Sequence, residues 1–124
     1  MGVTLATAGR NAAIAAIGAL HNSGTIVFQT AANQEVATCT FASTAFGAPS
    51  TGVITAAAIT ADSDATGGTI AKAVHYKSDG TTAILTATCT ATGGGGDYEF
   101  SSLAIGAGDT VRVDALTMEQ PAAA

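Results

Sequence analysis

From Thr25 onward, apolar and polar residues alternate in short runs, and this pattern limits the chain to a fold built mainly from β-strands. The runs are rich in Thr and in β-branched apolar residues, which suit strands with one buried and one solvated face. Turn residues separate the runs, and Ser78-Asp79-Gly80 is the clearest signal of a hairpin. The predicted strands are residues 25–30, 35–42, 52–60, 68–77, 82–91, 97–102 and 109–118.

The segment before these strands has a different period and predicts one N-terminal helix over residues 5–21. Ala13, Ile14, Ile17 and Leu20 recur at spacings of three and four, and Gly24 supplies a stop signal. The apolar stripe is narrow, so we expect the helix to pack on its own sheet or on a neighbouring subunit. The same residues resemble the apolar part of a signal peptide, but no convincing cleavage site follows, so we expect a helix of the mature protein and synthesis in the cytoplasm of the producing cell.

Seven short strands with turns between them predict the fold class. We expect a mainly β protein: an antiparallel β-sandwich or jelly-roll-like domain with one N-terminal α-helix. Its 124 residues suit a single domain over 1–124, with the β-sandwich at 25–118 and an extended tail at 119–124. No internal repeat or linker divides the chain.

Charge is sparse, which excludes several classes of partner. Charged residues make up 10% of the chain, and its four basic residues are scattered, giving a formal net charge of −5. Direct nucleic-acid binding normally requires clustered Lys and Arg, and a membrane-surface segment requires the same. No apolar run is long enough to span a bilayer. We therefore expect neither nucleic acid nor membrane as a direct partner, and favour a subunit that buries much of its surface against other proteins.

No catalytic or metal-binding signature is present, so we predict no enzyme activity, cofactor or metal site. Asp62-Ser63-Asp64 resembles part of a calcium loop, but the position of the bidentate Glu holds Ala73. A solvated loop is the favoured interpretation, with a weak cation site as the alternative. Four glycines at 93–96 lack the Lys of a phosphate-binding loop and predict a flexible turn. His21 is expected at the helix end and His75 within a strand, without a nucleophile signature around them.

Cys39 and Cys89 each stand between two threonines on a predicted strand. Their wide spacing gives no metal motif and no CxxC motif. The favoured interpretation is two small core side chains, and a disulfide between them or between chains is the alternative.

Several stretches resemble small structural proteins of tailed bacteriophages and prophages, over nearly the whole chain. The stretches are Ser43 to Thr51, Asp64 to Thr69 and Ser102 to Pro121, the last with I-x-x-G-D-T-V at Ile105 to Val111. The resemblance implies a non-enzymatic virion protein, of which a capsid decoration or cement protein is the favoured kind. It would bind the major capsid protein on the outer capsid surface as a homo-oligomer, with a trimer favoured.

Two alternatives stay open beside this interpretation. One is a neck, collar or tail-associated protein of the virion, and the other is a module that binds host glycans. The few aromatic residues and the lack of Trp argue against a glycan-binding face. For partner contact we select apolar residues of the helix and residues of two loops: Ile14, Ile17, Leu20, Phe46, Pro49, Asp62 and Asp64.

Overall fold

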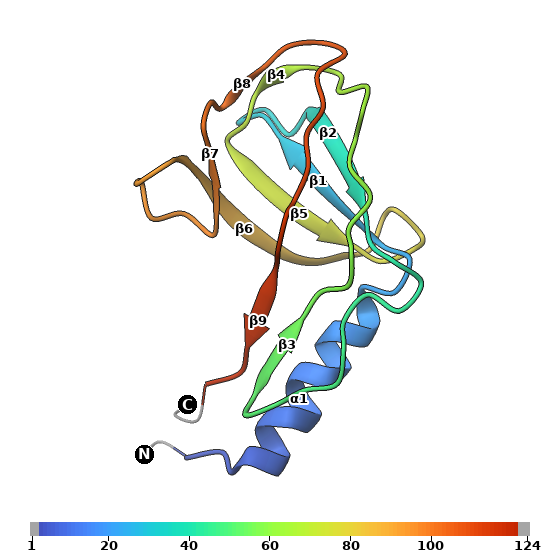
Figure 1. Cartoon of the computed structure of the whole chain (residues 1–124), viewed down its shortest axis with the longest axis vertical. Helices are drawn as coiled ribbons and strands as arrows, with labels where there is room; N and C mark the ends of the chain where they lie inside the picture. The colour runs from blue at the N-terminus through green and yellow to red at the C-terminus, as the bar shows by residue number, and fades with distance from the viewer. Residues whose placement is uncertain (1–2, 122–124) are drawn as a thin grey trace.

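A curved five-stranded sheet forms the larger part of the protein in this computed structural model, which describes residues 3–121 (Figure 1). Burial alternates along the strand at residues 25–28, where Ile26 and Phe28 are fully buried, as the sequence pattern predicts. The central strand at 72–76 departs from the pattern, because Ala73, Val74 and His75 are all buried. The strand order is β2-β1-β5-β6-β7. The bounds are β1 Thr25–Gln29, β2 Glu35–Thr40, β5 Lys72–Tyr76, β6 Ala83–Ala91 and β7 Tyr98–Phe100.

Two short strand pairs accompany this sheet. β3 (Val53–Thr55) pairs with β9 (Thr117–Glu119), and β4 (Gly68–Thr69) pairs with β8 (Ala104–Ile105), both antiparallel. The β3–β9 pair lies beside the helix, whereas the β4–β8 pair lies at the opposite end of the molecule (Figure 1). The mainly β architecture with one helix is therefore confirmed.

One hydrophobic core joins the sheet to the segments outside it. Phe28 and Val36 come from the five-stranded sheet, and Ile54, Ile70 and Val111 come from β3 and the connecting segments. All five side chains are almost completely buried. Because side chains from both parts fill the same core, neither part is folded independently of the other.

The helix α1 (Thr7–Leu20) confirms the predicted N-terminal helix within two residues at its start and one at its end. Gly18 faces the rest of the protein, and a Cβ atom there would lie 2.7 Å from Ile54 Cδ1. Glycine therefore allows the helix to approach β3 closely. Arg10 fixes the other end of α1 by donating hydrogen bonds of 2.9 Å to the carbonyl oxygens of Thr51 and Gln120.

The all-antiparallel prediction is wrong at the sheet edge, where β7 runs parallel to β6. A tight glycine loop makes this pairing physically accessible, because Gly93 and Gly95 adopt positive φ angles of 88° and 81°. The Glu99 carboxylate accepts hydrogen bonds from the amides of both glycines. The chain thus turns back on itself and starts β7 level with the end of β6.

The predicted strands 52–60 and 109–118 are mostly irregular. The first is a strand only at β3, and the second contains an isolated bridge between Val111 and Asp62 before β9 begins at Thr117. The predicted strand 68–77 divides into β4 and β5. The predicted tail begins too early, since Glu119 belongs to β9, and residues 122–124 lie outside the described residues. These segments bond to several different neighbours rather than to one continuous strand.

Candidate functional site

Three buried polar side chains form a hydrogen-bonded chain between the helix and the sheet. His21, the residue that follows α1, places Nε2 3.0 Å from His75 Nδ1 on β5. His75 Nε2 lies 2.8 Å from the Tyr98 hydroxyl on β7. At the other end, His21 Nδ1 lies 2.9 Å from the carbonyl oxygen of Ile17. The two histidines are 0% and 1% exposed, and Tyr98 is 8% exposed.

The position of each proton in this chain follows from its ends. The Ile17 carbonyl can only accept, so His21 Nδ1 carries a proton and donates it. A neutral His21 then accepts at Nε2, which requires His75 Nδ1 to donate. A neutral His75 in turn accepts at Nε2, so the Tyr98 hydroxyl donates to it. Every hydrogen bond therefore points from Tyr98 towards the helix.

Burial keeps all three groups neutral. It lowers the pKa of His75 from 6.5 to about 3, with a further lowering from nearby His21 and a smaller opposing effect of Asp97. Burial also lowers the pKa of His21, against the raising effect of its hydrogen bond to Ile17. Burial raises the pKa of Tyr98 well above its ordinary value, and the nearby Cys89, Cys39 and Asp97 add to this. The hydrogen-bond directions described above, which require neutral side chains, are therefore those expected at neutral pH.

The hydrogen bonds within this arrangement favour a structural role for the three side chains over a catalytic one. A neutral histidine can act as a base, but His75 has its basic Nε2 occupied by Tyr98, and His21 has its own occupied by His75. The rings of His21 and Phe41 meet edge to face with centroids 5.1 Å apart, and those of His21 and Phe46 do so at 5.3 Å. The polar chain is therefore enclosed by aromatic rings and ties α1 to the middle of the sheet.

Sequence reasoning placed both histidines correctly but did not pair them. A signal was present: His75 shares a strand face with Ala73, which the alternating pattern marks as buried. A buried histidine needs a hydrogen-bond partner, and the chain has only one other histidine.

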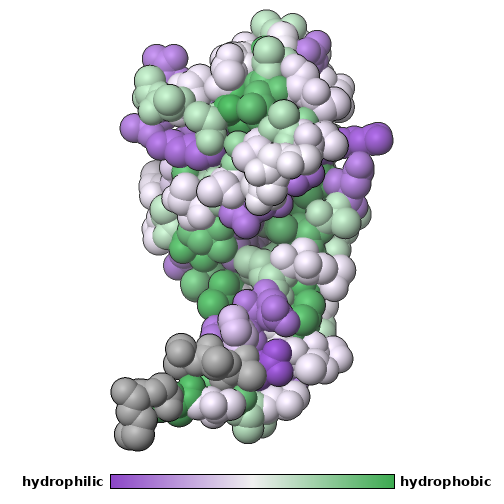
Figure 2. Space-filling model, turned by 90° about the vertical axis from the view of Figure 1, so that its left-hand side faces the viewer, coloured by the Kyte–Doolittle hydropathy of each residue, from purple (hydrophilic) through white to green (hydrophobic). Residues whose placement is uncertain are grey.

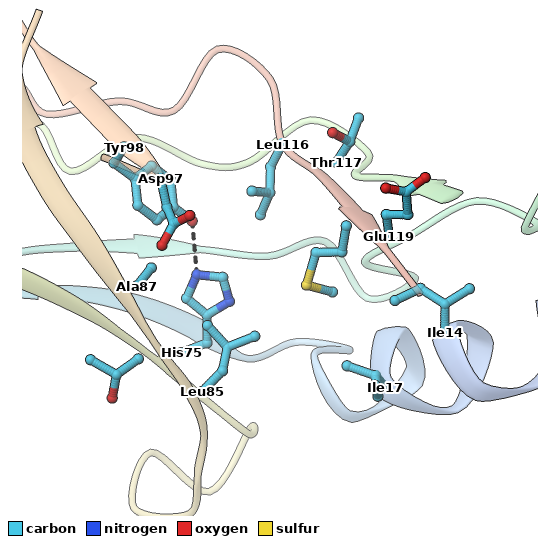
Figure 3. A pocket seen from close by; sticks show the side chains of 12 residues that line it. Ile14, Ile17, His75, Leu85, Ala87, Asp97, Tyr98, Leu116, Thr117 and Glu119 are labelled. Carbon is cyan, nitrogen blue, oxygen red and sulfur yellow. Dashed lines mark hydrogen bonds between the residues drawn. The ribbon is translucent and has the colours of Figure 1, made fainter. Parts of the chain in front are cut away.

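A cavity of about 410 Å³ opens beside this polar chain, between α1, β6 and β9. Figure 3 shows Tyr98, Asp97 and His75 on one side of it, and Glu119 on the other. Five apolar residues supply much of its lining: Ile14, Ile17, Leu85, Leu116 and Met118. A volume of this size lies within the range of roughly 300–1,000 Å³ that is typical of small-ligand sites.

The structure separates the selected contact residues into buried and accessible groups. Ile14 and Phe46 are 3% and 8% exposed and belong to the hydrophobic core, so little of either side chain reaches the outer surface. Ile17 and Pro49 are half-buried, and Leu20 is 43% exposed. The helix stripe thus turns inward at Ile14 and outward at Leu20, because α1 packs against β3 through Gly18.

The aspartates of the loop after Thr60 differ from each other. Asp62 is half-buried and accepts hydrogen bonds from the amides of Thr38 and Asp64, through different carboxylate oxygens. Its carboxylate therefore ties the loop to β2. Asp64 is exposed, and together with Leu20 and Pro49 it remains a predicted contact residue.

Both cysteines are buried free thiols, and no bond joins them. Cys39 lies on β2 and Cys89 on β6, with β1 and β5 between them in the sheet. The Cys39 thiol donates a 3.4 Å hydrogen bond to the Val111 carbonyl. The structure therefore has no disulfide within the chain, and both side chains fill the core, as the favoured interpretation predicted.

Slow alkylation of both cysteines is the expected chemical consequence. Burial raises the pKa of Cys89 to about 11 and also raises that of Cys39, so little reactive thiolate exists at neutral pH. We expect both thiols to react with iodoacetamide at least about tenfold more slowly in the folded protein than in denaturant, as judged by mass spectrometry of timed samples. Rapid labelling of either thiol in the folded protein would contradict its burial.

Three further findings bear on function. Within residues 3–121, no group of three or more His, Cys, Asp or Glu side chains is arranged to hold a metal ion. α1 has 14 residues, and the described part of the chain contains no helix that is long and apolar enough to cross a membrane. No protein-family model, curated protein or solved structure matches the chain.

Proposed function

We propose that the protein is a non-enzymatic structural component of a tailed-phage virion, most consistent with a capsid decoration or cement protein. In this role it binds the outer surface of the major capsid protein as a homo-oligomer, with a trimer favoured, and clamps neighbouring subunits. The resemblance of Ser102 to Pro121 and of the other stretches described above is the observation that carries the proposal.

The surface is compatible with assembly into a larger particle. Charged residues are few, and the largest exposed apolar side chains are Val3 and Leu20, at 65% and 43% exposure. Figure 2 shows hydrophobic residues in several groups, with neutral and hydrophilic residues between them, on one side of the molecule. Within residues 3–121, one edge of β9 has no strand partner, and an open edge of this kind favours a protein whose neighbours cover it.

A β-sandwich or jelly roll is the architecture we propose for this role. The five-stranded sheet would form one layer, and the segments 53–70 and 102–119 would form the other. The shared core, to which Ile54, Ile70 and Val111 contribute from the second group of segments, supports this arrangement.

The alternatives are distinguished by where the aromatic residues lie. A glycan-binding face normally exposes aromatic rings, but all four Phe and both Tyr residues of this chain are buried or half-buried. This disfavours a glycan-binding module. A neck, collar or tail-associated protein remains the second candidate within the virion.

Copy number in the particle tests the proposal. A decoration protein should be present at on the order of hundreds of copies per virion, because it follows the capsid lattice. Quantitative mass spectrometry of purified virions measures this number relative to the major capsid protein. About a dozen copies would favour the neck or tail alternative, since those parts follow the symmetry of a single axis. Absence from the particle would contradict both.

Binding to empty shells provides the matching functional measurement. We expect the purified protein to sediment with assembled shells that lack it and to ignore unassembled capsid subunits. Leu20→Lys should weaken shell binding if the exposed end of α1 makes contact, whereas Ala19→Lys, at the neighbouring exposed position, is the matched control. If both variants bound shells as tightly as the wild type, the exposed end of α1 would not be part of the contact surface.

A further inference from the structure

We propose that the cavity between β6 and β9 is a docking groove for an extended segment of another protein, one that carries apolar residues in alternate positions and Lys or Arg beside them. The segment would add a strand to the free edge of β9. This inference is independent of whether the protein belongs to a virion, because it rests on the groove alone.

The first support is the direction of the β9 backbone. Ala56 donates to the Leu116 carbonyl, and Gln120 donates to the Gly52 carbonyl, so residues 116, 118 and 120 bond towards β3. In an antiparallel pair the intervening residues point the opposite way. The amide and carbonyl groups of Thr117 and Glu119 therefore face the groove, and within residues 3–121 no strand pairs with that edge.

The opposite side of the groove, formed by β6, also presents backbone groups that no strand pairs with in the described part of the chain. β7 pairs with Cys89–Ala91 of β6, and among the described residues no strand lies on that side of the earlier part of β6. The Thr88 amide, which points away from β5, is bonded to the Asp97 carboxylate instead. Thr86 is two residues earlier, so its backbone groups point in the same direction and line the groove.

The floor between these walls is apolar. Leu116 and Met118 of β9 line the cavity with Leu85 of β6 and with Ile14 and Ile17 of α1. A strand laid beside β9 would direct every second side chain onto this floor. Val-sized or Ile-sized side chains would replace water against these residues, which supplies the apolar contribution to binding.

Charge selects the occupant. Asp97 and Glu119 line the groove together with neutral His75, and no Lys or Arg lines it (Figure 3). Glu119 is largely exposed, and its contact with Arg10 is long, at 3.8 Å, so its carboxylate remains available to a second cation. An occupant with basic residues would meet favourable potential, whereas an acidic occupant would be repelled.

A second copy of this chain is a poor occupant. Each copy carries a formal net charge of −5. Lys72 and Lys77 are the only two basic residues that lie close together in the sequence, and they bracket β5, which is a central strand of the sheet. A different protein with a basic, extended segment fits better.

A synthetic peptide tests the groove directly. The probe is fluorescein-labelled KVTVTVK, with EVTVTVE as the charge-reversed control, measured by fluorescence anisotropy at low salt with the full-length protein. We expect KVTVTVK to bind at least about tenfold more tightly than EVTVTVE. In amide-resolved NMR, the resonances of Thr117 and Glu119 should shift on binding, and exchange of their amide protons should slow.

Backbone methylation distinguishes strand addition from side-chain binding. One probe is N-methylated at its Val amides and another at its Thr amides. Strand addition predicts that only one of them loses at least about tenfold in affinity, because alternate amides face the protein. If both bind as tightly as the unmodified peptide, the groove is a pocket for apolar groups and the proposal is wrong.

Two protein variants complete the experiment. Glu119→Lys should weaken KVTVTVK binding at least about tenfold, whereas Asp114→Lys, which changes an exposed carboxylate outside the groove, should leave affinity within about twofold. If Glu119→Lys does not fold by circular dichroism, Glu119→Gln should still weaken binding. No saturable binding, equal affinity for the two peptides, shifts on another face, or a wild-type dimer that Glu119→Lys dissociates would each overturn the proposal.

Discussion

Acidification from pH 7 to pH 5 should lower the free energy of unfolding by about 2 kcal/mol through His75 alone. The pKa of His75 is 6.5 ordinarily and about 3 in the folded protein. Between these values the unfolded chain binds a proton that the folded chain does not, so protons favour unfolding. Stability is therefore fully present above pH 6.5 and is lost progressively as the pH falls towards 3. The lowered pKa of His21 adds to the loss in the same direction.

Urea denaturation at several pH values measures this effect. The window from pH 5 to pH 7 isolates the histidines, because Asp and Glu side chains titrate mainly below it and the chain has two histidines in all. The slope should reach at least about 1.4 kcal/mol per pH unit near pH 5.5, which corresponds to one proton. No slope in this window would contradict the neutral, buried state of the histidine pair.

His75→Asn provides the control. Asn can donate to His21 from nearly the same position as His75 Nδ1, but it does not titrate. We expect the variant to be less stable than the wild type at pH 7, because the Tyr98 hydroxyl loses its acceptor. Its slope between pH 5 and pH 7 should fall by about one proton. An unchanged slope would assign the proton uptake to another group.

The helix and the strands of the sheet could be predicted because local pattern determines them. The spacing of Ile14 and Ile17 predicts a helix, and the alternation around Ile26 and Phe28 predicts a buried strand face; both were confirmed. Strands 52–60 and 109–118 were predicted by the same alternation but are mostly irregular. Their bonds go to partners distant in sequence, such as Asp62 to Val111, and alternation does not specify such partners.

The parallel β6–β7 pair and the polar chain required information that one sequence pattern does not contain. The parallel pair depends on two carboxylates: that of Glu99 accepts from the amides of the glycine loop, and that of Asp97 accepts from the Thr88 amide of β6. The polar chain depends on three elements meeting, with His21 and His75 54 residues apart. The docking groove is similar, since β6 and β9 approach each other only in the folded chain. Sequence patterns can therefore predict a site in such a protein only where its residues lie close together in the sequence.

Gly24→Ala should destabilise the protein by about 3 kcal/mol or more, which corresponds to a fall in melting temperature of about 10 °C. A Cβ atom at Gly24 would lie 2.2 Å from the Tyr76 carbonyl oxygen and 2.9 Å from that of His21. Both obstacles are backbone atoms, so no side-chain rotation relieves the overlap. Gly24 also joins α1 to β1 by donating to the His21 carbonyl and accepting from the Phe41 amide.

Gly47→Ala is the matched control, because it adds the same methyl group at a glycine of a nearby loop. A Cβ atom there would have Thr55 O at 3.8 Å as its nearest neighbour, which is ordinary contact, and Gly47 does not have a positive φ. Its stability should change by less than about 1 kcal/mol, since the loss of glycine flexibility in the unfolded chain is mildly favourable. Thermal unfolding followed by circular dichroism compares the two variants. If the melting temperature of Gly24→Ala were within a few degrees of that of Gly47→Ala, the helix–strand junction would not approach β5 as closely as described. The expected result would mean that the close contact between this junction and β5 holds His21 in its position next to His75.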